Sequence, residues 1–297
     1  MAIVVVAGAT GNLGNKIVHA LVQKGALVHA IVRKGSNKLA IEKLAIQGVK
    51  VYTVTDYTSK ELLDACKGAD CIVSALAGLE EVIIDAQKAL AEAAIQTGVR
   101  RFIPSDFSLD FTNLVPGKNR NLDLRRSFHT YLQQKPINVT SIFNGAFMEL
   151  LTGEMPLILS KIKRVLYWGN SHVQMDFTHT DDVAQFTASA ALDTGTPRYL
   201  YIHGDRVSSS QVSTLLSELK GQKFGLLRPG GIGLLNIVIK IARTLSPGTK
   251  ALYPAWQGMQ YMRDMMEGRV MIEAYDNERY PDIQFKSIKE YLLTQNF

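Results

Sequence analysis

The N-terminus of the chain passes from a short apolar run directly into a glycine-rich segment, and this succession limits the fold more than any other feature. Residues 3–7 contain only Ile, Val and Ala, which predicts a buried strand, and residues 12–24 have the spacing of an amphipathic helix. The segment that joins them and opens the helix consists of Gly8, Ala9, Thr10, Gly11, Asn12, Leu13 and Gly14. Glycines at this spacing permit a tight turn, a close approach of the backbone to a pyrophosphate and close packing of helix on strand. The sequence therefore predicts a dinucleotide-binding loop whose phosphates contact the free N–H groups of the helix.

Apolar runs and amphipathic stretches alternate through the first half of the chain. Strands are expected at residues 3–7, 27–32, 49–55, 71–75, 101–104 and 139–143, and helices at residues 12–24, 37–47, 59–67, 80–97 and 121–134. Strands that alternate with helices form parallel sheets with right-handed crossovers. We expect an α/β fold, a Rossmann-type doubly wound parallel sheet, with residues 1–150 as the NAD(P)-binding domain.

The second half lacks this regular alternation. Strands are expected at residues 165–168, 173–177 and 198–202, and helices at residues 181–192, 209–219, 234–245 and 255–266. No linker rich in Pro, Gly or Ser separates the halves. Residues 151–297 are therefore predicted to form a smaller C-terminal α/β annex on the substrate side, which packs on the first domain and does not fold independently. The Met, Trp and Tyr residues of 255–266 fit an ordinary core better than an adaptable apolar pocket.

Composition limits the classes of partner. The chain has a net charge of +6, but its basic residues accompany no zinc-finger or RNA-binding pattern, so nucleic acid is an unlikely partner. Cys66 and Cys71 match no zinc-binding spacing, so we expect two reduced core residues and no metal. No run of residues is long and apolar enough to span a bilayer, and the first residues do not have the pattern of a secretory signal. We expect a cytoplasmic protein.

The end of the second predicted strand indicates which dinucleotide binds. Sites for NAD usually place Asp or Glu there to hold the ribose 2′-hydroxyl. This sequence has Arg33 and Lys34 instead, followed by Lys38. Charge-assisted contacts from these side chains suit a 2′-phosphate, so NADP(H) is the expected cofactor. The alternative is that these residues are ordinary solvated loop residues.

These segments together resemble the NmrA-like, atypical short-chain dehydrogenase/reductase family, which includes isoflavone-reductase-like enzymes. The glycine loop followed by Arg33 carries the resemblance, and residues 98–107 are similar to the family's "GVKRF.PSEFG". The resemblance covers residues 1–219. It implies that Asp56 and Tyr57 lie near the adenine. It also implies contacts with the ribose, the nicotinamide or the substrate for Ser74, Ala75, Leu76, Ser105, Asp106, Phe107 and Asn144.

The predicted catalytic position departs from the family pattern. Isoflavone-reductase-like enzymes carry a lysine used in proton transfer on the helix before the sixth strand, and the matching residue here is Arg125. Arginine stays protonated, so it suits an anionic substrate or an enolate-like intermediate better than proton transfer. His129 lies one helical turn further along and is a residue type that titrates near neutral pH, so His129, the cofactor ribose and solvent are the candidate proton donors. Tyr131 and Lys135 match the YxxxK string of other short-chain dehydrogenases, but at the wrong end of the helix.

Two functions follow from these residues. The first is an NADPH-dependent reductase that passes a hydride to a small apolar or aromatic acceptor. The second is a redox-sensing regulator that binds NADP(H) without turnover and acts through a protein partner. The missing lysine favours the regulator, and the apolar C-terminal annex favours the enzyme.

Overall fold

The main sheet has six parallel strands, and their order is that of a doubly wound fold. The computed structural model describes residues 1–56, 60–153, 157–248, 250–270, 272 and 274–295. The strands are β1 (Ile3–Ala7), β2 (Leu27–Arg33), β3 (Lys50–Val54), β4 (Cys71–Ser74), β5 (Arg101–Ile103) and β6 (Asn138–Val139). They pair in the order β3-β2-β1-β4-β5-β6. The predicted Rossmann-type α/β fold is confirmed.

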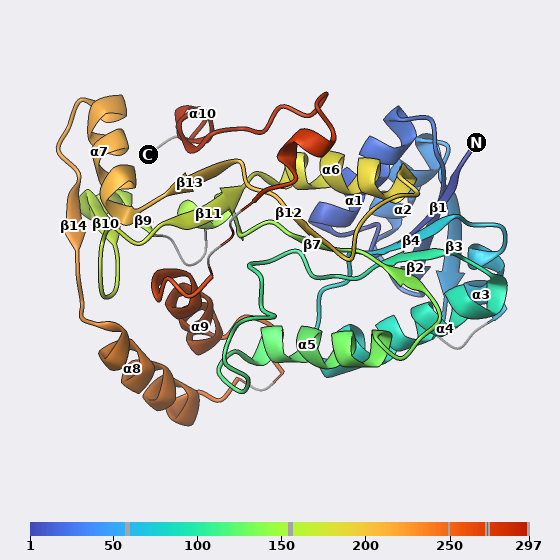
Figure 1. Cartoon of the computed structure of the whole chain (residues 1–297), viewed down its shortest axis with the longest axis horizontal. Coiled ribbons are helices and arrows are strands. Elements are labelled where there is room, and N and C mark those ends of the chain that lie inside the picture. The colour runs from blue at the N-terminus through green and yellow to red at the C-terminus, as the bar shows by residue number, and fades with distance from the viewer. Residues whose placement is uncertain (57–59, 154–156, 249, 271, 273, 296–297) are drawn as a thin grey trace.

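Helices cover both faces of this sheet (Figure 1). On one side lie α1 (Asn12–Gln23), α2 (Lys38–Ile46) and α6 (Thr180–Leu192), and on the other lie α3 (Lys60–Cys66), α4 (Gln87–Thr97) and α5 (Arg120–Leu132). Strand β1 separates two cores because successive side chains point to opposite faces. Val4 and Val6 pack with α1 and α6, whereas Val5 and Ala7 pack with α3, α4 and α5.

The strand expected at 139–143 is divided, and its second part pairs with a strand outside the six-stranded sheet. Strand β7 (Ser141–Phe143) pairs in parallel with β12 (Tyr199–Tyr201). The division falls at Thr140, whose N–H donates to Phe102 O at 3.1 Å, while the next N–H, that of Ser141, donates to Arg198 O at 2.9 Å. Residues after position 150 therefore supply β12 to a two-stranded sheet with β7, and they supply α6 to the helical cover of the main sheet.

The helix expected at 80–97 begins with a different geometry. Residues Glu81–Ala86 form a π-helix, and α4 starts only at Gln87. The fully buried Gln87 side chain donates to Ile83 O at 2.9 Å and accepts from the Ser105 N–H at 2.9 Å. A π-turn inserts an extra residue into the helix. Here it coincides with a side chain that holds the loop after β5.

The remainder forms a third core beyond the carboxyl end of the sheet. Two small sheets contribute β8 (Ala146–Phe147), β11 (Met175–Thr178) and β13 (Asp205–Val207), and β9 (Ile158–Leu159), β10 (Arg164–Leu166) and β14 (Gly225–Leu227). Helices α7 (Ser209–Lys220), α8 (Ile232–Leu245), α9 (Ala255–Met266) and α10 (Ile288–Leu293) pack around them, with 3-10 turns at Met148–Leu151, Ser160–Ile162 and Asn277–Arg279. The sequence did not predict β8, β9, β13, β14 or α10, because segments this short show no periodicity.

Side-chain burial agrees with the expected core residues. Met262 and Met266 lie in the third core, and Trp256 is 2% exposed. Cys66 and Cys71 are free and fully buried, and burial raises the pKa of both thiols to about 12. Within the described ranges, no helix has the length and apolar character needed to cross a bilayer, and no group of His, Cys, Asp and Glu side chains could hold a metal ion.

Candidate functional site

The glycine loop packs so tightly that two of its glycines have no room for a side chain. Gly8 has a φ of +83°, and a Cβ added there would lie 2.6 Å from Ala75 O. A Cβ on Gly14 would lie 2.1 Å from Gly8 O. These contacts bring the loop against the segment that follows β4 and bring α1 against the loop. The glycines thus perform the packing that their spacing predicts.

The N-terminus of α1 lacks a side-chain cap and an acidic residue of its own. Gly11 is the N-cap, makes no side-chain capping bond, and is exposed together with Asn12. Thr10 and Leu13 beside them are partly buried. The first turn of the helix holds no acidic residue. The first-turn N–H groups and the positive end of the helix dipole therefore suit an anionic group.

Positive side chains gather at the carboxyl end of β2, next to this loop. Arg33, Lys34 and Lys38 are exposed, and their side chains make no ion pair or hydrogen bond with any described residue. Asn37 between them caps α2 through a bond from the Ala40 N–H at 3.2 Å. Exposed positive charges that have no counter-ion among the described residues, next to a glycine turn and a helix N-terminus, suit a phosphate group.

The expected residues of the adenine side are only partly described. Asp56 is exposed just after β3, the strand next to β2. Tyr57, also expected there, lies outside the described residues.

A continuous series of contacts joins the loop to α5. The Ser105 hydroxyl donates to Leu76 O at 2.6 Å, next to the carbonyl of Ala75 that contacts Gly8. Arg125 Nε donates to Ser105 O at 2.8 Å. The fold therefore brings Gly8, Ala75, Leu76, Ser105 and Arg125 together at the carboxyl edge of β1, β4 and β5, where open α/β sheets bind ligands.

Two buried side chains near this edge keep an unsatisfied polar atom. Ser74 Oγ, at the end of β4, and Asn144 Oδ1, just after β7, are both fully buried and have no partner among the described residues. Thr178 Oγ1 donates to the backbone oxygen of Asn144 at 2.7 Å, which fixes the Asn144 backbone. A buried polar atom left unpaired costs about 1–3 kcal/mol, so both positions suit a polar group of a ligand.

Arg125 is held in place, and a residue from the C-terminal region lies beside it. Its NH1 group donates to Asn121 O at 3.0 Å. Tyr261 of α9 contacts the Asn121 side chain and lies within the field of Arg125. Burial raises the pKa of the Tyr261 hydroxyl to about 12, although the positive charge of Arg125 opposes this shift. The tyrosine is therefore a protonated hydrogen-bond donor at neutral pH, and the sequence did not single it out for chemistry.

The His129 side chain is buried and binds the loop that follows the carboxyl end of β5. Its side chain is 4% exposed, and Nε2 lies 2.5 Å from Asp106 Oδ2 and 3.2 Å from Ser141 Oγ. The Phe111 ring lies 4.9 Å from the imidazole. Asp106 is fully buried by the same packing. This placement argues against the expected direct proton transfer by His129. Asp106 Oδ1 has no partner among the described residues, so the expected cofactor contact of Asp106 stays a prediction.

The structure also shows where Phe107 and the YxxxK string lie. Phe107 is 8% exposed and packs into the core of α1 and α6. Tyr131 and Lys135 of the YxxxK string both bind Glu92 of α4, with Lys135 Nζ 2.5 Å from Oε1. The pair is thus engaged on the outer surface of α4 and α5, away from the glycine loop.

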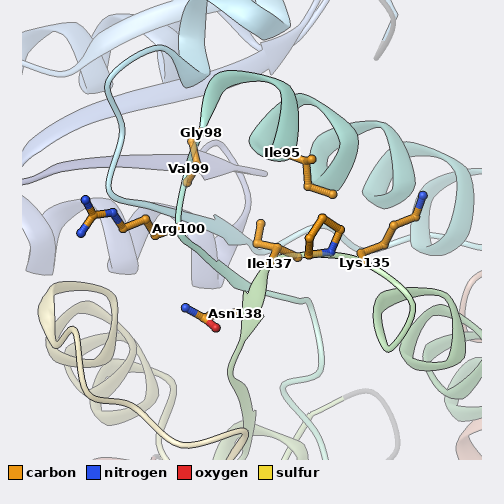
Figure 2. Close-up of a pocket in the computed structure, with 8 residues that line it drawn as sticks. Ile95, Gly98, Val99, Arg100, Lys135, Ile137 and Asn138 are labelled. Atoms are coloured by element: carbon orange, nitrogen blue, oxygen red, sulfur yellow. The ribbon is translucent and has the colours of Figure 1, made fainter.

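A hollow of about 480 Å³ lies at the opposite edge of the sheet (Figure 2). It is lined by Ile95, Gly98, Val99, Arg100, Lys135, Pro136, Ile137 and Asn138. These residues stand at the amino ends of β5 and β6, whereas the glycine loop follows the carboxyl end of β1. The hollow therefore does not belong to the candidate site.

Comparison with known families agrees with this geometry. Residues 2–227 match the model of the NmrA-like family. The chain belongs to this family. A bifunctional pinoresinol-lariciresinol reductase from Linum usitatissimum is 25% identical over 320 residues, which is 98% of this chain and 97% of the relative. Pinoresinol reductase 1 from Arabidopsis thaliana is 27% identical over 207 residues, and this match spans only 64% of either chain.

Several solved structures share the fold of this chain along almost its whole length. AtPrR2 with NADP⁺ and (+)pinoresinol superposes with a TM-score of 0.83 at 22% identity, covering 98% of this chain and 97% of that one. The binary complex of leucoanthocyanidin reductase with NADPH from Vitis vinifera gives a TM-score of 0.80 at 17% identity, covering 98% of both. The C-terminal region beyond residue 227 therefore also follows the fold of these reductases.

Proposed function

We propose that this protein binds NADP(H) and is an NADPH-dependent reductase of a small apolar or aromatic acceptor. The observation that carries the proposal is the glycine loop, in which neither Gly8 nor Gly14 has room for a side chain. The loop leads into α1, whose N-cap makes no side-chain hydrogen bond, and it lies next to the exposed Arg33 and Lys34. Reductases in complex with NADP⁺ or NADPH share the fold, which supports the choice of cofactor.

Each part of the site has a task in this proposal. The loop from Gly8 to Gly14 and the first turn of α1 would hold the pyrophosphate, and Arg33 with Lys34 and Lys38 would hold the 2′-phosphate. Asp56 would lie near the adenine. Ser74 and Asn144 would offer their unpaired polar atoms on the nicotinamide side, beside Ala75, Leu76 and Ser105. Bound NADPH supplies the hydride, and the protein residues bind and orient the reactants.

Arg125 and Tyr261 would act on the acceptor. Arg125 is fixed by Ser105 O and Asn121 O, so its charge is preorganised to stabilise an oxygen that becomes negative during reduction. Tyr261 keeps its proton and lies within the field of Arg125, so in this proposal it would donate a hydrogen bond or a proton to the same oxygen. His129 would bind Asp106 and position the loop that carries Ser105, and it would not touch the reactants.

A second candidate function is a redox-sensing regulator without turnover. Arginine in place of lysine and the burial of His129 leave the predicted catalytic residues without an accessible group that titrates near neutral pH. This observation favours a protein that binds NADP(H) and signals through a protein partner.

Cofactor titration followed by a turnover assay separates the two functions. We expect NADPH to bind more tightly than NADH, and NADPH consumption to rise above background with at least one acceptor in a panel of enones, quinones and other aromatic compounds. Tight NADPH binding without turnover across the panel would favour the regulator. Failure to bind either dinucleotide would refute both functions.

A further inference from the structure

Helix α8 exposes a row of large aliphatic side chains. Leu234, Ile237, Ile241 and Leu245 are 46%, 56%, 53% and 80% exposed. They are spaced by three or four residues, so they lie on one face of a helix with about 3.6 residues per turn. We call these four residues the α8 stripe. Burying such side chains in an apolar environment is favourable, so an uncovered row of this kind marks an interaction surface.

The stripe is separate from the face that α8 uses in the fold. Leu235 and Ile239 point into the third core and are 0% and 6% exposed. Helix α9 packs against α8, and Figure 1 shows α8 at the outer end of the molecule, far from the N-terminus and the main sheet. The helix is therefore anchored on one side and presents the stripe on another.

The chain segment that carries the stripe is strongly basic. Residues 221–262 contain no Asp or Glu but five basic residues, Lys223, Arg228, Lys240, Arg243 and Lys250, all of them exposed. Of the chain's 33 Lys and Arg residues, 28 lie outside this segment, against 27 Asp and Glu residues. Nearly all of the net charge of +6 is therefore concentrated on the part of the chain that carries the stripe.

This combination decides between partners. In a symmetric contact between two copies, the same surface meets itself, so the basic residues of one copy would face those of the other without acidic residues from this segment. An exposed aliphatic face on a segment that has exposed Lys and Arg but no Asp or Glu instead matches a surface with apolar chains beneath anionic headgroups. We propose that the α8 stripe inserts into the interface of an anionic phospholipid membrane, with the exposed basic residues against the headgroups.

Vesicle sedimentation with the full chain tests this proposal. We expect binding to vesicles of phosphatidylcholine mixed with phosphatidylglycerol, weak binding to phosphatidylcholine alone, and a loss of binding at high salt. The double variant Ile237→Asn and Ile241→Asn should lower binding at least tenfold. Lys240→Ala should lower it about fivefold, the effect of about one headgroup interaction. The matched controls are Ile46→Asn and Lys43→Ala on α2, where Ile46 is 85% exposed, and these should bind as the unaltered protein does.

All the altered side chains are exposed, so the circular dichroism spectrum and the NADPH affinity of each variant should equal those of the unaltered protein. Such agreement would exclude misfolding as the cause of a loss of vesicle binding. Absence of binding to anionic vesicles would overturn the proposal, as would equal binding to neutral ones or binding that the α8 variants leave intact. Light scattering provides the last test. A concentration-dependent dimer that the double variant abolishes would assign the stripe to a second copy of the chain and overturn the membrane proposal.

Discussion

Arg125 donates from Nε to the backbone oxygen of Ser105 at 2.8 Å, so its positive charge is tied to the loop after β5. If this charge stabilises the reduced oxygen of the acceptor, Arg125→Met should lower kcat/KM by about 10²–10³, the usual effect of removing one such donor. The dissociation constant of NADPH should change less than about twofold. Steady-state NADPH oxidation measures the first value and a binding titration the second. Lys118→Met, at an exposed lysine before α5, is the control.

Arg125→Lys separates charge from proton transfer at the same position. The lysine keeps the positive charge but introduces a group that can lose its proton, so turnover should acquire a pH dependence that the unaltered protein lacks. A pH profile of kcat measures this difference. Identical profiles for the two proteins would show that the residue at position 125 does not take part in the chemistry.

Arg33 should decide between the two dinucleotides. Loss of a charge-assisted bond costs about 1.5–3 kcal/mol, so Arg33→Ala should weaken NADPH binding roughly 10- to 150-fold and leave NADH binding nearly unchanged. Calorimetric titration with each dinucleotide measures both effects. Lys43→Ala, at an exposed lysine of α2, should leave both affinities unaltered. An equal loss for NADPH and NADH would contradict a contact with the 2′-phosphate.

The glycines allow backbone strain to be separated from steric contact. Gly35 has a φ of +87° and open space around its Cβ position, so Gly35→Ala should cost only the left-handed strain, about 1–2 kcal/mol. Gly8→Ala adds the contact with Ala75 O and should cost a further 1–3 kcal/mol or so. Urea unfolding of both variants measures the difference. Equal losses of unfolding free energy in Gly35→Ala and Gly8→Ala would mean that the backbone around Gly8 shifts at little cost to make room for the added Cβ.

The His129–Asp106 pair should contribute to stability more than to cofactor binding. Removal of one partner from a buried pair costs about 3–5 kcal/mol, so His129→Ala should lower the free energy of unfolding by that order. His172→Ala, at an exposed histidine, should change it by less than about 0.5 kcal/mol. A stable His129→Ala protein with abolished turnover would instead restore His129 as a proton donor.

The two cysteines predict how stability responds to alkaline pH. Burial raises the pKa of the Cys66 and Cys71 thiols from 9.0 to about 12, so between these values the unfolded chain releases protons that the folded protein retains. The free energy of unfolding should therefore fall as the pH rises above about 9. Urea unfolding over this range measures the slope, and Cys66→Ala should reduce it. Rapid labelling of either thiol in the native protein at neutral pH would contradict their burial.

Local patterns predicted much of this protein. Strand β1, the glycine loop and helix α1 follow from residues that are neighbours in the chain, because the periodicity of apolar side chains and the φ of glycine are local properties. The same holds for α9, whose bounds agree with the predicted ones. Where a local pattern was too short to have a period, as in β8 and β9, prediction failed.

The candidate site depended more on packing. The sequence placed His129 on the same face of α5 as Arg125, but the aspartate that binds it comes from the loop after β5, so its burial could not be read from α5 alone. Tyr261 meets the Asn121 side chain, and comes within the field of Arg125, only because α9 folds back on α5. No spacing in the chain signals such a contact.

The sequence by itself therefore determined the first half of the fold, from the order of strand, glycines and helix to the basic residues after β2. The tertiary structure alone decided which side chains stand beside Arg125, which histidine is withdrawn into the core, and that the α8 stripe faces outward. The physical reason is that backbone conformation and periodicity are set by adjacent residues. Burial and side-chain contacts, in contrast, arise between segments that are distant in the chain and meet only when the cores pack.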